Sequence, residues 1–414
     1  MSEKEGDRVP IHRPEIGDEE VAAVEKVLRS GWLTTGAECR AFEEELAAYL
    51  GARHAVAVNS CTAALHLALE AVGLERGMRV LVPTLTFAAT AEVVSYFGAI
   101  PVLIDVEPRT LTVDVEAAAA TAEALAEGRP VAGVSARESG PAHAILPVHY
   151  GGQMADTDGI AALAKRFKLR VIEDAAHALP SHTRSPGGPW RSVGTTAEQT
   201  CFSFYSTKTI TTGEGGMLVT DDPAIAERAR RMSLHGLSND AWRRHSGGGW
   251  NYEILATGYK YNLTDIAAAL GRVQLRKADR FNEARHRIAE RYGRLLADVD
   301  EVELPCAHPD RRPSWHLFTL RLRLDRLSIG RDQFIEELRA RGIGVSVHWR
   351  PLHLHPFYRD TYHHRPEDFP VASAEWQRFV SLPIFPSLTE AEIERVAGAV
   401  REVSGRFGRR RAVG

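Results

Sequence analysis

The chain has few cysteines, little net charge and no long apolar run. Only four of its 414 residues are cysteine, and no two of them form a Cys-x-x-Cys pair. This spacing argues against a disulfide framework and is typical of free thiols in a reducing cytoplasm. The formal net charge of −3 gives no global basic field, so the composition argues against a nucleic-acid partner. The cysteines are Cys39, Cys61, Cys201 and Cys306.

Signals for a membrane or for export are also missing. No stretch reaches the roughly 18 consecutive apolar residues that a membrane-spanning helix needs. The N-terminal segment MSEKEGDR is charged and has no apolar centre of the kind found in secretory signals. We therefore expect a cytoplasmic protein without a membrane partner.

A histidine-rich stretch near the C-terminus raises the question of a metal site. Residues 348–364 read HWRPLHLHPFYRDTYHH, but they contain no His-Glu-x-x-His pair or other fixed ligand spacing. We interpret these histidines as lining a loop and predict no metal.

The pattern of apolar runs predicts an α/β fold. Short β-branched runs alternate with helical stretches rich in Ala, Leu and Glu, which is typical of a mainly parallel sheet covered on both faces. With 44% hydrophobic residues, the chain is long enough to bury a large core and to divide into domains. The predicted strands are 55–60, 79–84, 101–106, 144–149, 170–175, 199–204 and 215–220.

A smaller α+β domain is predicted to follow the large one. A long helical stretch from about Thr264 to Leu296 leads into it, and the only loose insert in the large domain is around 135–144. We place the large domain, with its N-terminal segment, at 1–265 and the linking helix and small domain at 266–414. The small domain is predicted to contain strands at 316–324 and 342–349 and helices at 331–342 and 388–403.

Ligands of parallel α/β sheets bind beyond the carboxyl ends of the strands. Several predicted strands end in polar or small residues, so these ends are the place to look for a site. One lysine, Lys208, follows such a strand in the stretch CFSFYSTKTITTGEGG. A lysine amine can form a Schiff base with a carbonyl, and pyridoxal 5′-phosphate (PLP) is the cofactor that uses this chemistry. The alternative is an ordinary solvated lysine.

A PLP site needs a carboxylate for the pyridine nitrogen, a phosphate cradle and an aromatic face. Asp174 ends the run LRVIED and could supply the carboxylate, or else cap a helix. The stretch NSCTAALHLAL leads small residues into a helix N-terminus, which attracts anions, although many strand–turn–helix units look alike. Ser203 could add a hydroxyl or be an ordinary strand serine, and Phe87 could stack on the ring or lie in the core.

Six longer stretches resemble successive signatures of the DegT/DnrJ/StrS family of PLP-dependent sugar aminotransferases. The likeness runs from about Ile11 to Val403 and implies a type I aminotransferase fold and a homodimer whose active sites are shared. The stretches are NSCTAALHLAL, VPTLTFAATAEVVSYFGAIPVLIDVEPRTL, VHYGGQMADTDGI, VIEDAAHA, CFSFYSTKTITTGEGGMLVTDD and GYKYNLTDIAAALGRVQL.

The resemblance also assigns roles to individual residues. It makes Lys208 the Schiff-base lysine and Asp174 the partner of the pyridine nitrogen. A histidine replaces a common glutamine at His177, near the cofactor, and Cys61 replaces a common glycine. Either Lys260 or Asn262 would reach the phosphate of the other subunit, and we favour Asn262. The remaining expected cofactor contacts are Phe87 on the ring face and Thr62, Ala63 and Ser203 on the phosphate.

The lysine segment TKTITTGEGG is similar to enzymes that aminate C4 of a nucleotide-linked 4-keto sugar, with L-glutamate as the donor. Aminotransferases for C3 keto sugars or keto-cyclitols share the cofactor machinery and remain alternatives. A non-catalytic regulatory protein on the same fold would lack Lys208 or Asp174, and both are present. Three further segments, 30–36, 234–240 and 315–318, resemble family segments around the sugar-nucleotide pocket.

Overall fold

The computed structural model of the chain describes residues 8–238 and 251–409. Asn239 and Asp240, the end of one predicted sugar-pocket segment, lie outside the described residues. Within the described ranges, no helix is both long enough and apolar enough to cross a membrane. All four cysteines are described, and each is a free thiol as predicted.

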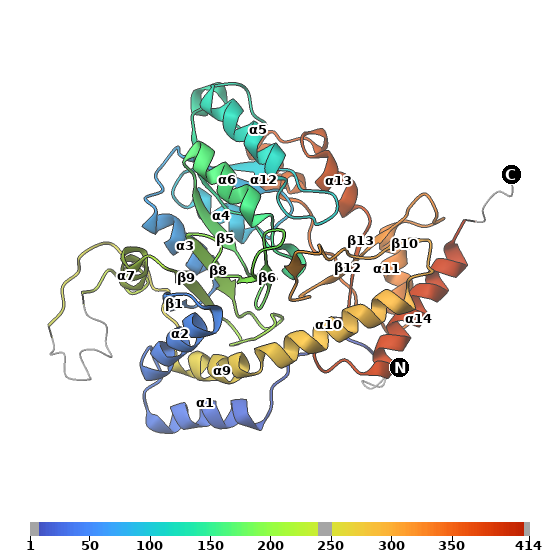
Figure 1. Ribbon diagram of the computed structural model, residues 1–414, viewed down its shortest axis with the longest axis horizontal. Helices are drawn as coiled ribbons and strands as arrows, with labels where there is room; N and C mark the ends of the chain where they lie inside the picture. Colours follow the sequence, from blue (N-terminus) through green and yellow to red (C-terminus); the bar gives the residue numbers. More distant parts are fainter. Residues whose placement is uncertain (1–7, 239–250, 410–414) are drawn as a thin grey trace.

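The centre of the molecule is a seven-stranded sheet of order β1-β9-β8-β5-β4-β2-β3 (Figure 1). Strands β8, β5, β4, β2 and β3 run parallel, whereas β9 is antiparallel to both of its neighbours. The predicted mainly parallel sheet is therefore confirmed. The strands are β1 (His54–Val58), β2 (Arg79–Pro83), β3 (Ile100–Ile104), β4 (Ala142–Ile145), β5 (Arg170–Asp174), β8 (Gln199–Ser203) and β9 (Gly216–Thr220).

Strand β4 departs from its predicted position. It begins at Ala142, inside the stretch predicted as a loose insert, and its ladder ends at Ile145. Beyond that point only Val148 forms an isolated bridge, to Asp174. Pro147 explains the early end, because proline has no N–H to donate to a ladder.

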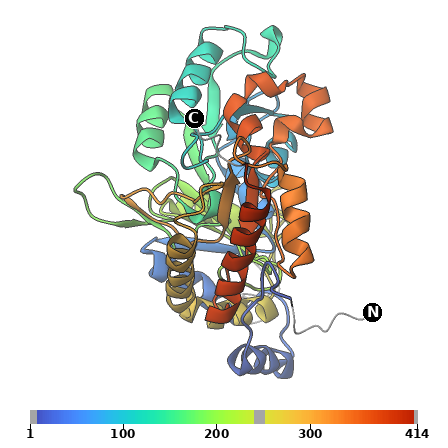
Figure 2. The ribbon, with the colours of Figure 1, turned by 90° about the vertical axis from the view of Figure 1, so that its right-hand side faces the viewer.

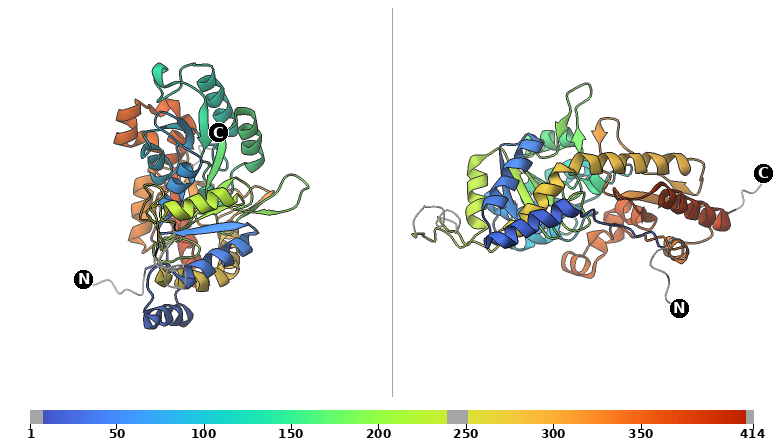
Figure 3. Two further views of the ribbon diagram at one scale, coloured as in Figure 1. Left: turned by 90° about the vertical axis from the view of Figure 1, so that its left-hand side faces the viewer. Right: turned by 90° about the horizontal axis from the view of Figure 1, so that it is seen from below.

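Helices cover both faces of the sheet. Alternate residues of one strand point to opposite faces, so Val56 and Val58 join one core while Ala55 and Ala57 join another. On the first face lie α3 (Cys61–Ala71), α4 (Ala89–Ser95) and α7 (Pro223–Met232). The opposite face is covered by α2 (Ala37–Leu50), α5 (Val115–Ala126), α6 (Thr157–Phe167) and α9 (Asp265–Arg276), and α1 (Asp18–Ser30) packs on α9 (Figure 3).

A second core lies around an antiparallel sheet of order β10-β12-β13. Figure 2 shows α10, α14 and α11 side by side over this part of the molecule. The predicted helix at 264–296 is two helices that meet at Lys277. The elements are α10 (Ala278–Leu295), β10 (Val302–Glu303), β12 (Phe318–Leu322), α11 (Arg331–Ala340), β13 (Phe379–Leu382) and α14 (Glu390–Phe407).

The predicted strand at 342–349 is wrong. Only isolated bridges occur there, from Ile343 to Val9 and from Ser346 to Ser381. A side chain at Gly344 would come within 2.7 Å of the backbone nitrogen of Ile11, so this segment packs closely on the N-terminal chain. That contact replaces a regular ladder, and the partner of β12 is instead β13.

The two cores exchange segments that are distant in sequence. Val9 belongs to the small-domain core, whereas α12 (Pro356–Tyr362) and α13 (Pro370–Trp376) contribute to the core of the large sheet. A short sheet of β6 (His182–Thr183), β7 (Arg191–Ser192) and β11 (Arg311–Arg312) also links the two parts. The domain division at 265/266 stays a proposal, and packing crosses it in both directions.

Candidate active site

A cavity of about 540 Å³ opens beyond the ends of β5 and β8, beside the N-terminus of α3. This is the edge of the sheet at which the sequence placed the site. Six of the eight predicted site residues line the cavity: Thr62, Phe87, Asp174, His177, Ser203 and Lys208. Ala63 and Asn262 do not.

Lys208 reaches the cavity from a tight turn that follows β8. Its backbone N–H donates to the carbonyl oxygen of Tyr205 over 2.9 Å, which closes the turn. Burial lowers the pKa of the Lys208 amine from 10.5 to about 8, although nearby Cys61 and Asp174 act in the opposite direction. A much larger fraction of the amine is therefore neutral near pH 7 than for a solvated lysine, and the neutral amine is the nucleophile.

Asp174 is the last residue of β5 and presents a buried carboxylate to the same cavity. Its Oδ2 accepts a hydrogen bond from the Thr90 hydroxyl at 2.8 Å, and its Oδ1 accepts one from the backbone N–H of Ala176 at 3.1 Å. Burial raises the pKa of Asp174, while these two donors and Lys208 oppose the rise. The chain turns after Ala176 without starting a helix, so the helix-cap alternative for Asp174 is wrong.

Two other polar residues near the strand ends, Glu173 and Thr84, are directed away from the cavity. Glu173 points to the opposite side of β5, where it accepts hydrogen bonds from Thr196 and Thr200 at 2.7 and 2.9 Å. Thr84 forms a 2.7 Å hydrogen bond with His353. Because successive side chains of a strand alternate between faces, only one of the two acidic residues that end β5 can reach the site.

The start of α3 is a candidate anion site in which one backbone N–H group already has a hydrogen-bond partner. The Ser60 hydroxyl caps the helix by accepting the backbone N–H of Ala63 at 3.1 Å, and Ala63 itself is buried. The Ala63 amide is therefore already paired, whereas Thr62 faces the cavity. Gly216 of β9 permits this packing, since a side chain there would come within 2.4 Å of the carbonyl carbon of Ser60.

Aromatic rings form the opposite wall. Phe87 has 59% of its surface exposed and its ring centroid lies 6.3 Å from that of Trp349, so the core alternative for Phe87 is wrong. The His177 ring is stacked on Trp349 at 4.8 Å and lies 4.1 Å from the ring of His316. The Gly151 N–H donates to Nδ1 of His177 at 3.3 Å, a contact that only an unprotonated Nδ1 can accept. Burial, with Lys208 and His348, keeps the pKa of His177 well below its usual range.

Three cavity residues, His316, His348 and Trp349, were not predicted as site residues. Each had a signal in the sequence, since His316 lies in the family-like segment 315–318 and the other two begin the histidine-rich stretch. What the sequence lacked was the contact that brings these distant segments over the end of β5.

Asn262 and Lys260 lie apart from the cavity, beside the end of β1. Asn262 forms an isolated bridge with Val58 and donates from Nδ2 to the Thr35 hydroxyl at 2.8 Å, while its Oδ1 accepts from the exposed Lys260 amine. Thr35 belongs to the segment 30–36, which therefore contacts Asn262 rather than lining the cavity.

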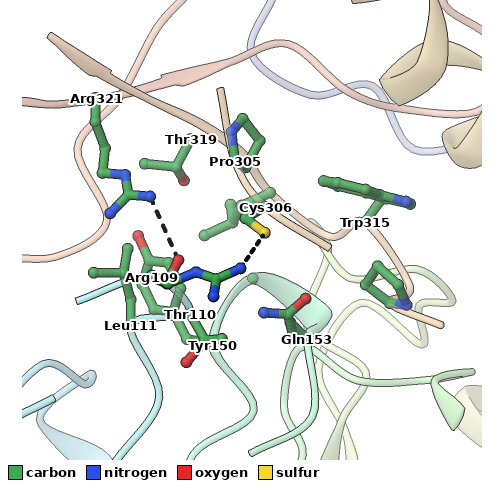
Figure 4. A pocket seen from close by; sticks show the side chains of 13 residues that line it. Arg109, Thr110, Leu111, Tyr150, Gln153, Pro305, Cys306, Trp315, Thr319 and Arg321 are labelled. Carbon is green, nitrogen blue, oxygen red and sulfur yellow. Dashed lines mark hydrogen bonds between the residues drawn. The ribbon is translucent and has the colours of Figure 1, made fainter. Parts of the chain in front are cut away.

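A separate, smaller hollow of about 50 Å³ lies between the two cores (Figure 4). Arg109 donates to the sulfur of Cys306 at 3.6 Å there, and Arg321 donates to the carbonyl oxygen of Arg109 at 3.4 Å. None of the predicted site residues lines this hollow. The amine, the carboxylate and the aromatic wall instead meet in the larger cavity.

The larger cavity fits PLP. It combines a lysine amine of lowered pKa, a buried carboxylate, a helix N-terminus and exposed aromatic faces, and its volume is in the range of small-molecule sites. When bound, PLP supplies an aldehyde that a lysine amine can attack and a pyridine ring that withdraws electrons. The chain's part is to supply the amine, fix the ring and receive the phosphate.

Known proteins resemble the chain over nearly its whole length. It is 41% identical over 396 residues to the uncharacterized protein MJ1066 of Methanocaldococcus jannaschii, covering 95% of this chain and 97% of the relative. It is 40% identical over 405 residues to the spore coat polysaccharide biosynthesis protein SpsC of Bacillus subtilis, covering 97% and 99%. The PLP form of the putative sugar aminotransferase Spr1654 from Streptococcus pneumoniae superposes with a TM-score of 0.84 at 28% identity, covering 96% and 99%.

The family resemblance seen in the sequence is confirmed by a family-wide comparison. The pattern of the DegT/DnrJ/EryC1/StrS aminotransferase family matches residues 14–401. Together with a solved relative in its PLP form, this match makes the fold that of the PLP-dependent sugar aminotransferases and PLP the cofactor. The chain belongs to the DegT/DnrJ/EryC1/StrS aminotransferase family.

Proposed function

We propose that the protein transfers the amino group of L-glutamate to C4 of a nucleotide-linked 4-keto sugar. The observation that carries this proposal is the meeting of Lys208 and Asp174 in one cavity, with Lys208 inside the segment TKTITTGEGG that resembles C4 aminotransferases. The name of the relative SpsC, a polysaccharide biosynthesis protein, supports a role in making a sugar building block.

Lys208 and Asp174 would divide the work between them. The Lys208 amine would hold the cofactor and then carry a proton between the donor carbon and the cofactor, a role that suits a pKa near the working pH. The Asp174 carboxylate would hold a proton on the pyridine nitrogen through a charge-assisted hydrogen bond. Thr90 and the Ala176 amide keep that carboxylate oriented toward the ring.

The other predicted residues would bind the rest of the cofactor. His177 and Phe87 would contact the two faces of the ring, and Thr62 and Ser203 would donate hydroxyl hydrogen bonds to the phosphate. We keep Ala63 in the proposed phosphate site only as part of the helix N-terminus, because its own amide is paired with Ser60.

The space beside the cavity suits a bulky acceptor. A second hollow of about 580 Å³ shares Thr86, Phe87 and Trp349 with the cofactor cavity. Its lining combines aromatic rings with the guanidinium of Arg350, which could receive a nucleoside base and a phosphate. Glutamate and the sugar would use the cofactor cavity in turn, so the kinetics should be ping-pong.

The proposal includes a homodimer in the cytoplasm. Asn262 and the exposed Lys260 lie outside this chain's own cavity, so they would complete the phosphate site of the partner subunit. Free thiols in place of disulfides support a reducing compartment.

The deciding experiment offers several ketones to the enzyme after its cofactor has been converted to the amine form. A 4-keto sugar nucleotide, a 3-keto sugar nucleotide and a keto-cyclitol are added separately, and the return of the cofactor's visible absorbance is followed together with the mass of the product. We expect return with the 4-keto sugar nucleotide. Return only with the 3-keto sugar or only with the cyclitol would overturn the C4 assignment, and 2-oxoglutarate serves as the positive control.

A further inference from the structure

Arg285 is a buried arginine in the middle of α10. Only 1% of its surface is exposed, and it is among the largest fully buried side chains of the protein. Among residues 8–238 and 251–409, no carboxylate offsets its charge, and burial alone lowers the pKa of its guanidinium to about 10. An unpaired buried cation is costly, so its retention calls for a compensating role.

The guanidinium is directed at backbone carbonyl groups. Its Nη1 donates to the carbonyl oxygen of Ile384 at 2.8 Å, to that of Trp315 at 3.2 Å and to that of His316 at 3.5 Å. Its Nε and Nη2 are buried without a partner in the described chain. One cation therefore joins the turn at 315–316 to the segment after β13.

The turn that Arg285 holds is backbone-strained. Trp315 has φ of +50°, in the left-handed region that a bulky side chain rarely adopts. Its other side is fixed to the large domain, because Ser314 N–H donates to the carbonyl of Gly152 and Leu317 N–H to that of Gly151, both at 3.2 Å. Arg285 supplies the contacts from the side of the small domain.

The strained turn delivers His316 into the cofactor cavity. The His316 ring lies 4.1 Å from His177, and its Nδ1 is buried without a hydrogen-bond partner among the described residues. The charged or titratable groups that face it are His177 after β5, Lys208 after β8, His348 before α12 and Arg285 on α10. Burial is the main reason that the pKa of His316 lies well below its usual range, and each of these four groups lowers it further.

The same cation lies near a second histidine that contacts the lysine turn. His12 donates from Nε2 to the carbonyl oxygen of Ser206 at 3.0 Å, two residues before Lys208. Burial, followed by the charge of Arg285, lowers the pKa of His12 to about 4. Arg285 therefore borders both the turn of His316 and the contact that supports the turn of Lys208.

We propose that Arg285 is a positioning residue of the active site, which fixes the His316 ring against His177. Its Nη1 orients the carbonyl groups of the strained turn. Its charge adds to the burial that already disfavours a proton on His316 and His12. The Lys208 amine is then left as the group that exchanges protons in the cavity. This inference concerns the aminotransferase chemistry of the family and does not depend on which sugar is the acceptor.

The test compares the variants Arg285→Met and Arg285→Lys with Arg287→Met, a control on the same helix that removes an exposed arginine. Each holoenzyme is titrated with acid and base while the visible absorbance of its bound cofactor is recorded, and its half-reaction with L-glutamate is timed. Methionine fills a buried site without charge, so the fold should be kept.

We expect Arg285→Met to slow the half-reaction by about ten- to hundredfold, because a displaced group beside reacting atoms costs on that order. Its absorbance should also show an acid transition at a higher pH than in the parent, since one of the charges that lower the pKa of His316 is gone, while burial, His177 and Lys208 still lower it. Adding His316→Gln should remove that transition. Arg285→Lys keeps the charge, but its shorter side chain withdraws the donor from the carbonyl groups that Nη1 contacts, so it should slow the half-reaction without moving the transition.

A parental rate and a parental acid transition in Arg285→Met would overturn the proposal and leave Arg285 a structural residue. Should the methionine variant fail to fold, Arg285→Lys decides, since a parental rate there would show that the reach of Nη1 to the turn does not position it. An acid transition that persists after His316→Gln would equally overturn the assignment to His316.

Discussion

Thr90 donates its hydroxyl proton to Oδ2 of Asp174 across 2.8 Å, and Thr86 lies 2.7 Å from the same hydroxyl. Because Thr90 has one proton and gives it to the carboxylate, the Thr86 hydroxyl must donate to Thr90. The buried hydroxyls of Thr86 and Thr90 therefore point in one direction, toward the Asp174 carboxylate that lines the cavity at the end of β5. These hydroxyls favour the ionised form of Asp174, although burial still raises the pKa of its carboxyl group.

The change Thr90→Val should slow the half-reaction with L-glutamate by about ten- to hundredfold. It removes a hydrogen bond to a charged group, which is worth about 1.5–3 kcal/mol, while keeping the shape of the side chain. With one donor lost, the pKa of Asp174 should rise further, which weakens its hold on the pyridine nitrogen. Single-turnover absorbance changes measure the rate.

Ser95→Ala is the matched control for that experiment. Ser95 lies on the same helix, and its buried hydroxyl has no hydrogen-bond partner in the described chain, so its removal should leave the half-reaction unchanged. A Thr90→Val enzyme as fast as this control would show that the hydroxyl does not support Asp174.

The pKa of Lys208 predicts how cofactor capture depends on pH. Burial lowers that pKa to about 8, so the fraction of neutral amine rises steeply up to pH about 8 and little beyond it. The rate at which the apoprotein takes up PLP should follow this rise. A rate that continued to climb toward pH 10.5 would mean that the Lys208 amine behaves as a solvated lysine. Lys208→Ala should abolish turnover altogether.

The lowered pKa of Lys208 should also make the stability of the apoprotein depend on pH. Between pH about 8 and about 10.5 the unfolded chain holds a proton on Lys208 that the folded chain has released. The free energy of unfolding should therefore rise with pH across this window, and the destabilisation is fully present below it. Urea unfolding at a series of pH values should show this slope in the parent and lose it in Lys208→Met.

The residues that the sequence placed beside the cavity correctly are those whose position depends on local structure. Lys208 and Asp174 each follow a strand of the same parallel sheet, and the carboxyl ends of such strands meet at one edge. The pattern of apolar runs was therefore enough to bring these two residues into one cavity. The amphipathic helices α11 and α14 were equally clear, since each buries one periodic face.

The contacts that sequence reasoning missed are between segments far apart in the chain. Trp349 and His348 lie in a stretch whose alternating apolar pattern suggests a strand, but the stretch packs on the N-terminal segment and forms only isolated bridges. In the sequence, Arg285 looks like any other charged residue of a helix, because its sequence neighbours do not show that this face of α10 is buried. The pairing of the Ala63 amide with Ser60 likewise depends on a side-chain rotamer that no pattern encodes.

The geometry at the start of α3 allows a loss of PLP affinity to be separated from a loss of protein stability. Thr62→Val removes a hydroxyl that faces the cavity, so PLP affinity should fall by about tenfold or more, the value of one hydrogen bond to a charged phosphate. Ser60→Ala removes the cap of α3 and should instead destabilise the protein by about 1 kcal/mol. Cofactor titration of the apoproteins and thermal unfolding measure the two effects. Equal PLP affinity in the parent and Thr62→Val would remove Thr62 from the phosphate site.

Sharing of active sites between two subunits can be tested by mixing one inactive and one weakened variant. Lys208→Ala should lack the amine in its own cavity, whereas Asn262→Ala should weaken the cavity of its partner, because Asn262 lies outside the cavity of its own chain. In a mixed dimer of the two variants, one site then carries both changes and the other carries neither.

Random exchange of equal amounts of these variants should restore about a quarter of the parental activity, since half of the dimers are mixed and each holds one intact site. The mixture is denatured and refolded together with PLP, and it is compared with each variant refolded alone. Lys260→Ala in place of Asn262→Ala identifies which of the two neighbouring residues reaches across. If both residues acted only within their own subunit, a mixed dimer with Lys208→Ala would have no intact site, and the activity of the mixture would equal the mean of the two variants.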